Sequence, residues 1–217
     1  MTKNKIIDDV ILRITKGKPS NDIELERAQV SHWVGITANE MATDALKASL
    51  GNSSAINGNY IIVEKGLIFT PEVTQGSSEY GNRNYVEILN KPLGLPYDAG
   101  IVYVTTDSGK EILSTTHTHI STVRELEMTK PSPSVPVYHR EEKKLFIEGF
   151  TTTMMYSLYE YNNLTVHVHY VPSMEALDGD EELPISDDLA MELADRVEEI
   201  ARRQHGQIND LINDGVE

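Results

Sequence analysis

Hydrophobic residues at the start of the chain recur with the spacing of an amphipathic helix. The first apolar stripe predicts a short helix that ends at Gly17, and its members are Ile6, Ile7, Val10, Ile11 and Ile14. A second stripe predicts a longer helix that opens with a capping box at Asn21 and Glu24 and ends at Gly51. Its members are Val30, Trp33, Val34, Thr37, Met41, Ala45 and Ala48. Two consecutive helices joined by a short turn form an αα-hairpin.

After this hairpin the pattern changes to short apolar runs and to the two-residue alternation of β-strands. Pairs of runs that flank turn residues predict three β-hairpins, which join 60–63 to 67–69, 101–106 to 110–113, and 137–138 to 145–147. A last strand is predicted over 164–171, because its apolar and polar residues alternate. One face of that strand carries Leu164, Val166, Val168 and Tyr170, and the other carries Thr165, His167 and His169.

Helical sequence returns beyond an acidic loop at 172–185. Ser186 has the side chain of a helix cap, and Asp187 and Asp188 follow where the helix dipole favours negative charge. The helix is predicted to run from 186 to 204. We expect it to pack with the N-terminal hairpin, because each has one apolar stripe to bury. The predicted core of this bundle comprises Val34, Met41, Leu193, Val197 and Ile200.

The order helix–helix, strands, helix predicts an α+β fold, in which a small helical bundle carries a large β-rich middle segment. A length of 217 residues fits one domain. We therefore expect one composite domain with three parts. Residues 1–51 form the helical hairpin, 52–172 the β-rich segment, and 173–217 the acidic loop, the last helix and the tail.

Composition excludes several classes of protein. The chain has no cysteine, which rules out a disulfide scaffold and thiolate chemistry. It has no run of eighteen apolar residues, so no membrane-spanning helix is expected. Acidic residues interrupt the first apolar stretch, so the N-terminus is not expected to be a signal peptide.

Negative charge is concentrated in the last fifth of the chain. The formal net charge is −15, and residues 172–217 hold fourteen acids against three arginines. A protein that grips DNA needs the opposite sign to neutralise phosphates. An acidic surface beside DNA repels it instead and lets it slide. The simpler interpretation is a solvated face that keeps the protein soluble.

Two His-x-His pairs are candidate metal ligands. On adjacent strands His117, His119, His167 and His169 would offer four imidazoles to zinc. The alternative is a polar sheet face, and we favour it because no carboxylate lies at a fixed ligand spacing. We therefore expect no metal, no cofactor and no catalytic residue. Motifs for a phosphate-binding loop, a calcium loop or a serine nucleophile are incomplete or missing.

Two other features suggest contacts between subunits. Ten tyrosines against three phenylalanines suit half-solvated interfaces, and Tyr156 and Tyr159 are the candidates. The tail 206–217 follows a predicted helix break at Gly206 and is expected to act as a docking strap. Its anchors would be Ile208, Leu211 and Ile212. The alternative is a frayed terminus.

Three segments together resemble the head-to-tail connector proteins, also called adaptor or ring proteins, of short-tailed bacteriophages of the crAss-like group. They are the helical hairpin 6–50, the β-hairpin 137–147, and the strand 164–172 with the acids, Leu183-Pro184 and helix that follow it.

The resemblance implies a non-enzymatic virion protein, assembled in the host cytoplasm. It would be one subunit of a homo-oligomeric ring, twelve-fold in similar proteins, that lies beneath the portal protein. The ring would extend the DNA channel, contact the passing genome without sequence specificity, and receive other ring or tail proteins. Two alternatives stay open: a metal-dependent β-domain enzyme that uses the His-x-His pairs, and a carbohydrate- or peptide-binding module with a tyrosine-rich β face.

Overall fold

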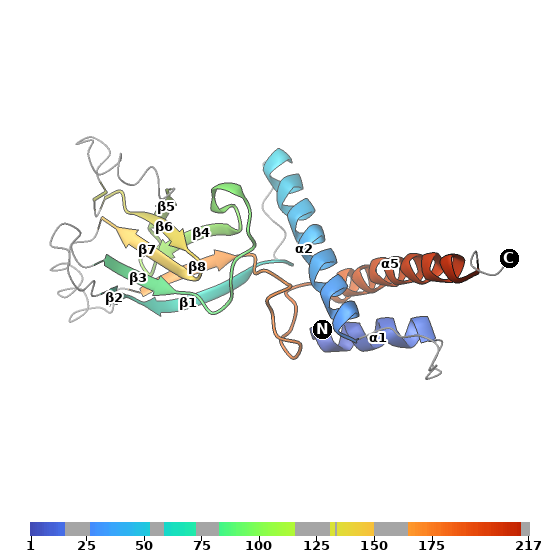
Figure 1. Cartoon of the computed structure of the whole chain (residues 1–217). Coiled ribbons are helices and arrows are strands. Elements are labelled where there is room, and N and C mark those ends of the chain that lie inside the picture. Colours follow the sequence, from blue (N-terminus) through green and yellow to red (C-terminus); the bar gives the residue numbers. More distant parts are fainter. Residues whose placement is uncertain are drawn as a thin grey trace. The chain divides into compact units, whose positions relative to one another are not determined.

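The fold is α+β, as predicted: among the described residues, three long helices precede and follow a sheet-rich middle segment along the chain (Figure 1). This computed structural model describes residues 1–15, 27–52, 59–72, 83–115, 131–132, 134–149 and 165–213. The chain divides into two compact units. A helical unit comprises Met1–Tyr60 and Ser173–Glu217, and a β unit comprises Ile61–Pro172.

The helical unit is a bundle of α1 (Lys3–Thr15), α2 (Arg27–Asn52) and α5 (Asp187–Asn213), in which each helix packs on the other two. The predicted bundle is therefore confirmed. Val34, Met41, Leu193 and Val197 are buried as predicted, whereas Ile200 is only half-buried. The buried face of α2 continues through Ala38, Ala42 and Leu46, so Ala45 and Ala48 lie beside it. The capping box at residues 21–24 lies outside the described residues.

The β unit is one eight-stranded sheet in the described part of the chain, with the order β1-β8-β4-β5-β6-β7-β3-β2. Neighbouring strands are antiparallel except β5 and β6, which are parallel. The strands are β1 (Ile62–Ile68), β2 (Thr70–Glu72), β3 (Arg83–Glu87), β4 (Ile101–Thr106), β5 (Glu111–Ser114), β6 (Val137–Glu141), β7 (Lys144–Glu148) and β8 (Thr165–Tyr170). A short 3-10 helix, η1 (Pro96–Asp98), precedes β4.

The sheet must be rolled, because its two edge strands are consecutive in the chain. Only Phe69 separates the end of β1 from the start of β2, and neighbouring Cα atoms are about 3.8 Å apart. On the side of β3, the Glu64 carboxylate of β1 accepts a hydrogen bond from the Leu89 N–H at 2.9 Å. The roll encloses an apolar core of Val86, Ile88, Ile101, Val104, Ile112, Tyr138, Leu145, Ile147, Val166, Val168 and Tyr170.

The first predicted hairpin is wrong. Residues 62–68 form the single strand β1, which pairs with β8 along its length. The Glu-Lys-Gly segment is a β-bulge between Glu64 and Leu67, and Gly66 has φ +71°. A glycine between two apolar runs has the same sequence signature in a bulge as in a turn, and here β1 pairs with β8 on both sides of the bulge.

The other β predictions are confirmed. β4 and β5 form an antiparallel hairpin, with Gly109 at φ +77° in its turn. β6 and β7 form the second, with Glu142 at φ +54°. In β8, Val166, Val168 and Tyr170 are buried and the alternate residues are half-buried, as the alternation predicts, while Leu164 of the predicted apolar face lies outside the described residues.

The predicted helix break at Gly206 is also wrong. α5 continues through Gly206 to Asn213. A glycine within a helix costs about 1 kcal/mol relative to alanine, which weakens a helix without ending it. The segment predicted as a docking strap therefore begins as the last turns of α5.

The packing of the bundle predicts a strong effect at Leu193, whose side chain is fully buried. Leu193→Ala should lower the free energy of unfolding by about 2–5 kcal/mol because it leaves a cavity. Leu193→Asp should prevent folding, because it buries an unpaired charge. Circular dichroism and chemical denaturation measure both effects. Met191→Ala is the control, since Met191 is 60% exposed and its loss should change stability by no more than about 0.5 kcal/mol. A soluble, helical Leu193→Asp chain would contradict this layout.

Candidate functional site

The acidic loop that precedes α5 is bound to the N-terminus of the chain by backbone hydrogen bonds. The Asn4 N–H donates to the Gly179 carbonyl at 2.8 Å, and the Leu183 N–H donates to the Met1 carbonyl at 3.1 Å. Thr2 and Glu182 form an isolated antiparallel bridge between these two contacts. The loop therefore has a fixed conformation, although it contains no long helix or strand.

The side chain of Lys3 holds the same loop through hydrogen bonds. Its side chain is 5% exposed, and its Nζ donates to the carbonyl oxygens of Met174 at 3.4 Å, Glu175 at 3.1 Å and Leu177 at 3.4 Å. Burial lowers the pKa of Lys3, and the nearby carboxylates of Glu175 and Asp178 oppose that effect. One ammonium group thus satisfies three carbonyls of a tight turn.

α2 also contacts the acidic loop. The Asn39 side-chain oxygen accepts a hydrogen bond from the Met174 N–H at 2.7 Å. A Cβ atom at Gly35 would lie 2.8 Å from the Glu175 Cα, so only glycine allows this close approach. The loop backbone therefore lies directly on the helix.

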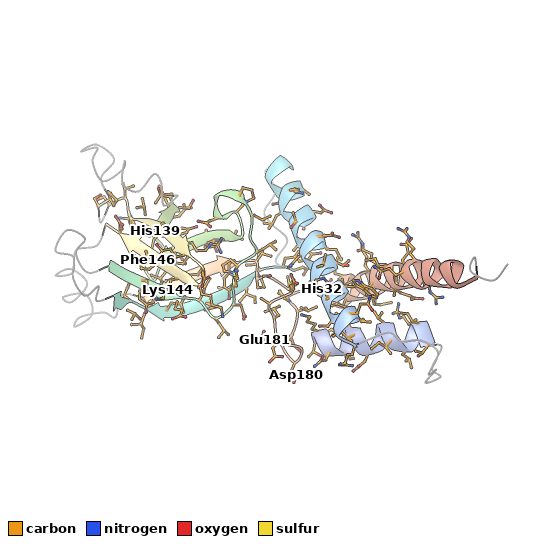
Figure 2. The ribbon with its side chains drawn as sticks, in the orientation of Figure 1. His32, His139, Lys144, Phe146, Asp180 and Glu181 are labelled. Carbon is orange, nitrogen blue, oxygen red and sulfur yellow. The ribbon has the colours of Figure 1, made fainter. Side chains whose placement is uncertain are left out.

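This arrangement presents carboxylates to solvent. Figure 2 shows Asp180 and Glu181 on the loop, and Asn4 holds the Asp180 carboxylate at 2.8 Å. The predicted candidates Asp187 and Asp188 are exposed in the first turn of α5. The Ser186 hydroxyl caps this helix as predicted, accepting from the Leu189 N–H at 3.4 Å. The loop and the helix start form one acidic surface.

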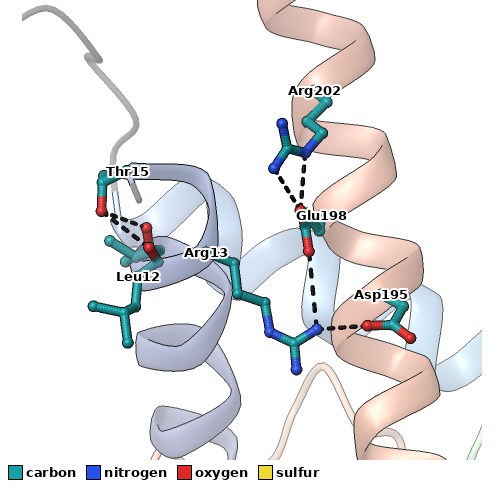
Figure 3. A network of polar contacts seen from close by, with 7 residues as sticks. Leu12, Arg13, Thr15, Asp195, Glu198 and Arg202 are labelled. Carbon is teal, nitrogen blue, oxygen red and sulfur yellow. Dashed lines mark hydrogen bonds and ion pairs between the residues drawn. The ribbon is translucent and has the colours of Figure 1, made fainter. Parts of the chain in front are cut away.

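The arginines of α5 do not neutralise that surface. Each pairs with the glutamate four residues before it, at 2.6 Å for Arg196–Glu192, 2.7 Å for Arg202–Glu198 and 2.5 Å for Arg203–Glu199. These pairs lie further along the helix. Arg13 of α1 adds a bridge at the same level, 2.5 Å from Asp195 and 3.8 Å from Glu198 (Figure 3).

The helical unit also contains a shallow groove of about 390 Å³ between α2 and α5. Both signs of charge line it, together with one exposed apolar side chain, Ile36, which is 37% exposed. The lining residues are Ile36, Asn39, Glu40, Thr43, Asp44, Lys47 and Arg196.

The described histidine pair has structural contacts. The His167 Nδ1 accepts a hydrogen bond from the Gly66 N–H at 3.2 Å, and its Nε2 lies 2.7 Å from the Asp107 carboxylate. His169 stacks on Tyr103, with ring centroids 3.9 Å apart. Partial burial is the largest of the causes that lower the pKa of His169, and the nearby His167 and Lys65 lower it further. One ring nitrogen of His167 thus contacts the bulge in β1, and the other contacts the turn after β4.

Within the described ranges, no three His, Asp or Glu side chains gather as metal ligands. The expectation of a metal-free protein stays a prediction, which elemental analysis would check. His117, His119, Tyr156 and Tyr159 lie outside the described residues. For Ile208, Leu211 and Ile212, the structure describes a helical backbone. No helix among the described residues is long and apolar enough to cross a membrane.

Sequence reasoning missed two features of this site. The groove combines residues of α2 with one of α5, so no local pattern encodes it. Lys3 did have a signal, because it precedes Ile6, Ile7 and Val10 at helical spacing and is therefore a lysine within an apolar stripe.

From the three hydrogen bonds of Lys3 to the loop, we expect Lys3→Met to lower the free energy of unfolding by about 1–3 kcal/mol, because three carbonyls lose their donor. Lys5→Met is the matched control, since Lys5 lies two residues along α1 and is exposed. Chemical denaturation of the two variants gives the difference. Equal stability would show that the carbonyls find other partners.

Comparison with known protein families gives a match over most of the chain. A family model described as phage tail ring protein 2, of the crAss-like group, matches residues 5–200, which include the β unit and most of the helical unit. No curated protein matches the chain. The match confirms the resemblance drawn from the helical hairpin, the β6–β7 hairpin and the strand–acidic loop–helix segment. The chain therefore belongs to the tail ring protein 2 family of crAss-like phages, a family of structural components of the phage tail.

Proposed function

We propose that this protein is a non-enzymatic ring subunit of the head-to-tail connector, where copies of the chain surround the DNA channel beneath the portal. The observation that carries the proposal is the family match, because a tail ring family implies a virion protein that assembles with copies of itself. The position near the portal and the role in the channel are the steps that we add.

The acidic surface of the helical unit supports a role in the channel. Asp180, Asp187 and Asp188 are exposed on it, and the arginines of α5 are already paired within their own helix. Carboxylates that line a channel repel phosphates, so DNA does not adhere to the wall. Contact with the genome would then be brief and independent of sequence.

The end of α5 supports docking to another protein. Ile208, Leu211 and Ile212 have the spacing of one apolar stripe, and the described backbone there is helical. The last hydrogen bond between the described residues of α5 and the rest of the bundle joins Gln204 to Gln29. An amphipathic helix beyond that point suits a groove on the portal, on another ring or on an adjacent subunit.

The test is electron microscopy of tails isolated from the phage, combined with native mass measurement of the connector. We expect a closed ring of this chain, twelve-fold, adjacent to the portal, with the acidic loop facing the lumen. A single copy, or a ring remote from the portal, would contradict the proposal.

A chain truncated after His205 tests the docking role of the helix end. The fold should be retained, because the described core of α5 ends at Ala201. Attachment to the connector should weaken, as occupancy in the particle would measure. A control with Ile208, Leu211 and Ile212 changed to Gln keeps the length and removes only the apolar stripe. Unchanged occupancy of both variants would contradict the docking role of the helix end, but it would not contradict the proposed ring.

A further inference from the structure

We propose that His167 is a pH-dependent switch on the outer face of the β unit. Its neutral ring holds the bulge of β1, and its protonated ring releases that bulge. The ring joins two segments that are distant in sequence, the bulge at Gly66 and the turn at Asp107. The inference concerns the β unit alone and goes beyond the proposed ring, on which it does not depend.

The two contacts of the imidazole fix the position of its hydrogen. The Gly66 N–H donates to the His167 Nδ1 at 3.2 Å, so Nδ1 must carry a lone pair. The Nε2 lies 2.7 Å from the Asp107 carboxylate, which only accepts when it is ionised, so Nε2 must carry a hydrogen. The neutral Nε2–H tautomer is therefore the form of the ring that satisfies both contacts.

A second proton on the ring breaks one contact and keeps the other. The ring is 27% exposed, so solvent protons reach it. The proton binds to Nδ1, and Nδ1–H then faces the Gly66 N–H, which leaves two donors opposite each other without an acceptor. The contact with Asp107 becomes a charge-assisted hydrogen bond at the same time. We therefore expect the protonated ring to stay on Asp107 and to turn away from the bulge.

The structure around the two contacts favours movement of the bulge rather than of the turn. Asp107 accepts a hydrogen bond from the Thr165 hydroxyl, and its N–H donates to the Thr165 carbonyl at 3.3 Å. At the bulge the register with β8 shifts between Glu64 and Leu67. Apart from the chain neighbours of Gly66, no described atom would lie within 4 Å of a Cβ at this position. The bulge therefore has room to move when its hydrogen bond to the ring is lost.

Charged groups of both signs face the ring from the adjoining strands. Lys65 lies in the bulge of β1, His169 lies two residues along β8, and Glu111 lies on β5, one strand beyond β4. Asp107 makes the direct contact. Burial, followed by the charges of His167 and Lys65, lowers the pKa of His169. His169 is therefore the neighbour whose own titration the test has to separate from that of His167.

Nuclear magnetic resonance of the intact chain tests the switch. At about pH 8 the ring-nitrogen shifts of His167 should identify the Nε2–H tautomer. As the pH falls to about 5, across the range in which histidines gain charge, the Gly66 amide signal should shift with the same midpoint as the His167 ring. Hydrogen exchange of that amide, corrected for the intrinsic effect of pH, should become about two- to tenfold faster, as expected for the loss of one ordinary hydrogen bond.

Two variants of the same residue separate its two contacts. His167→Asn places an amide oxygen near the position of Nδ1, so the Gly66 amide should stay protected at both pH values. His167→Gln places an amide nitrogen near the position of Nε2, which keeps a donor for Asp107, so the Gly66 amide should exchange fast at both. His169→Phe is the matched control, because it keeps an aromatic ring on Tyr103 and removes the neighbouring titratable group. The pH response of Gly66 should persist in this control.

Three results would overturn the switch: a Gly66 amide that does not follow the His167 ring, an Nδ1–H tautomer at about pH 8, or a pH response that disappears in His169→Phe. A full pH response in His167→Asn would overturn it as well. None of these results would bear on the proposed ring, which electron microscopy of the tail tests separately.

Discussion

The helical unit depends on one buried ammonium group. Lys3 donates to three carbonyls of the loop that leads into α5, and this contact spans 171 to 174 positions of the sequence. Burial lowers the pKa of Lys3, so the folded chain holds this proton less tightly than the unfolded chain does. The contribution of the residue to stability is therefore larger above the ordinary lysine pKa, near 10.4, than at neutral pH. At neutral pH the charge itself opposes folding, and the hydrogen bonds to the loop offset that cost. Lys3, the close contact at Gly35, the Asn39 side chain and the backbone hydrogen bonds with the N-terminal residues together hold the conformation of the acidic loop.

The β unit depends on a comparable tie between distant segments. Glu64 accepts hydrogen bonds from the Leu89 N–H and from the Tyr170 hydroxyl, which joins β1 to β8 and to the end of β3. His167 reinforces β1 from the outer face, because its Nδ1 holds the Gly66 N–H in the bulge. A rolled sheet whose edge strands are consecutive needs such ties, since an open edge would expose unpaired backbone groups. The histidine that suggested a metal ligand in the sequence thus has a structural role.

The sequence predicts elements better than it predicts their partners, for a physical reason. Apolar spacing reports which face of an element is buried, and it located the three long helices of the described residues, the last two hairpins and the alternation of β8. It does not report what covers that face. Gly66 and His167 are 101 residues apart, so no local signal distinguished a bulge from a turn. Gly206 was predicted as a break because propensity is local, whereas α5 continues through it. Capping rules predicted Asp187 and Asp188 at the start of α5. The contacts that hold the acidic loop and the α2–α5 groove arise only from tertiary packing.

The charge distribution restricts how copies of this chain can associate. In the proposed ring, acidic loops that face the lumen would lie near one another, and like charges would raise the free energy of the assembly. The contact between copies must therefore lie away from the loop and must use apolar or paired groups. Salt would screen the repulsion between these loops over about 10 Å at 0.1 M, and it would also screen repulsion between the loops and DNA. In the proposed ring, the acidity that would keep DNA from adhering to the channel wall is thus the same property that the contacts between subunits would have to overcome.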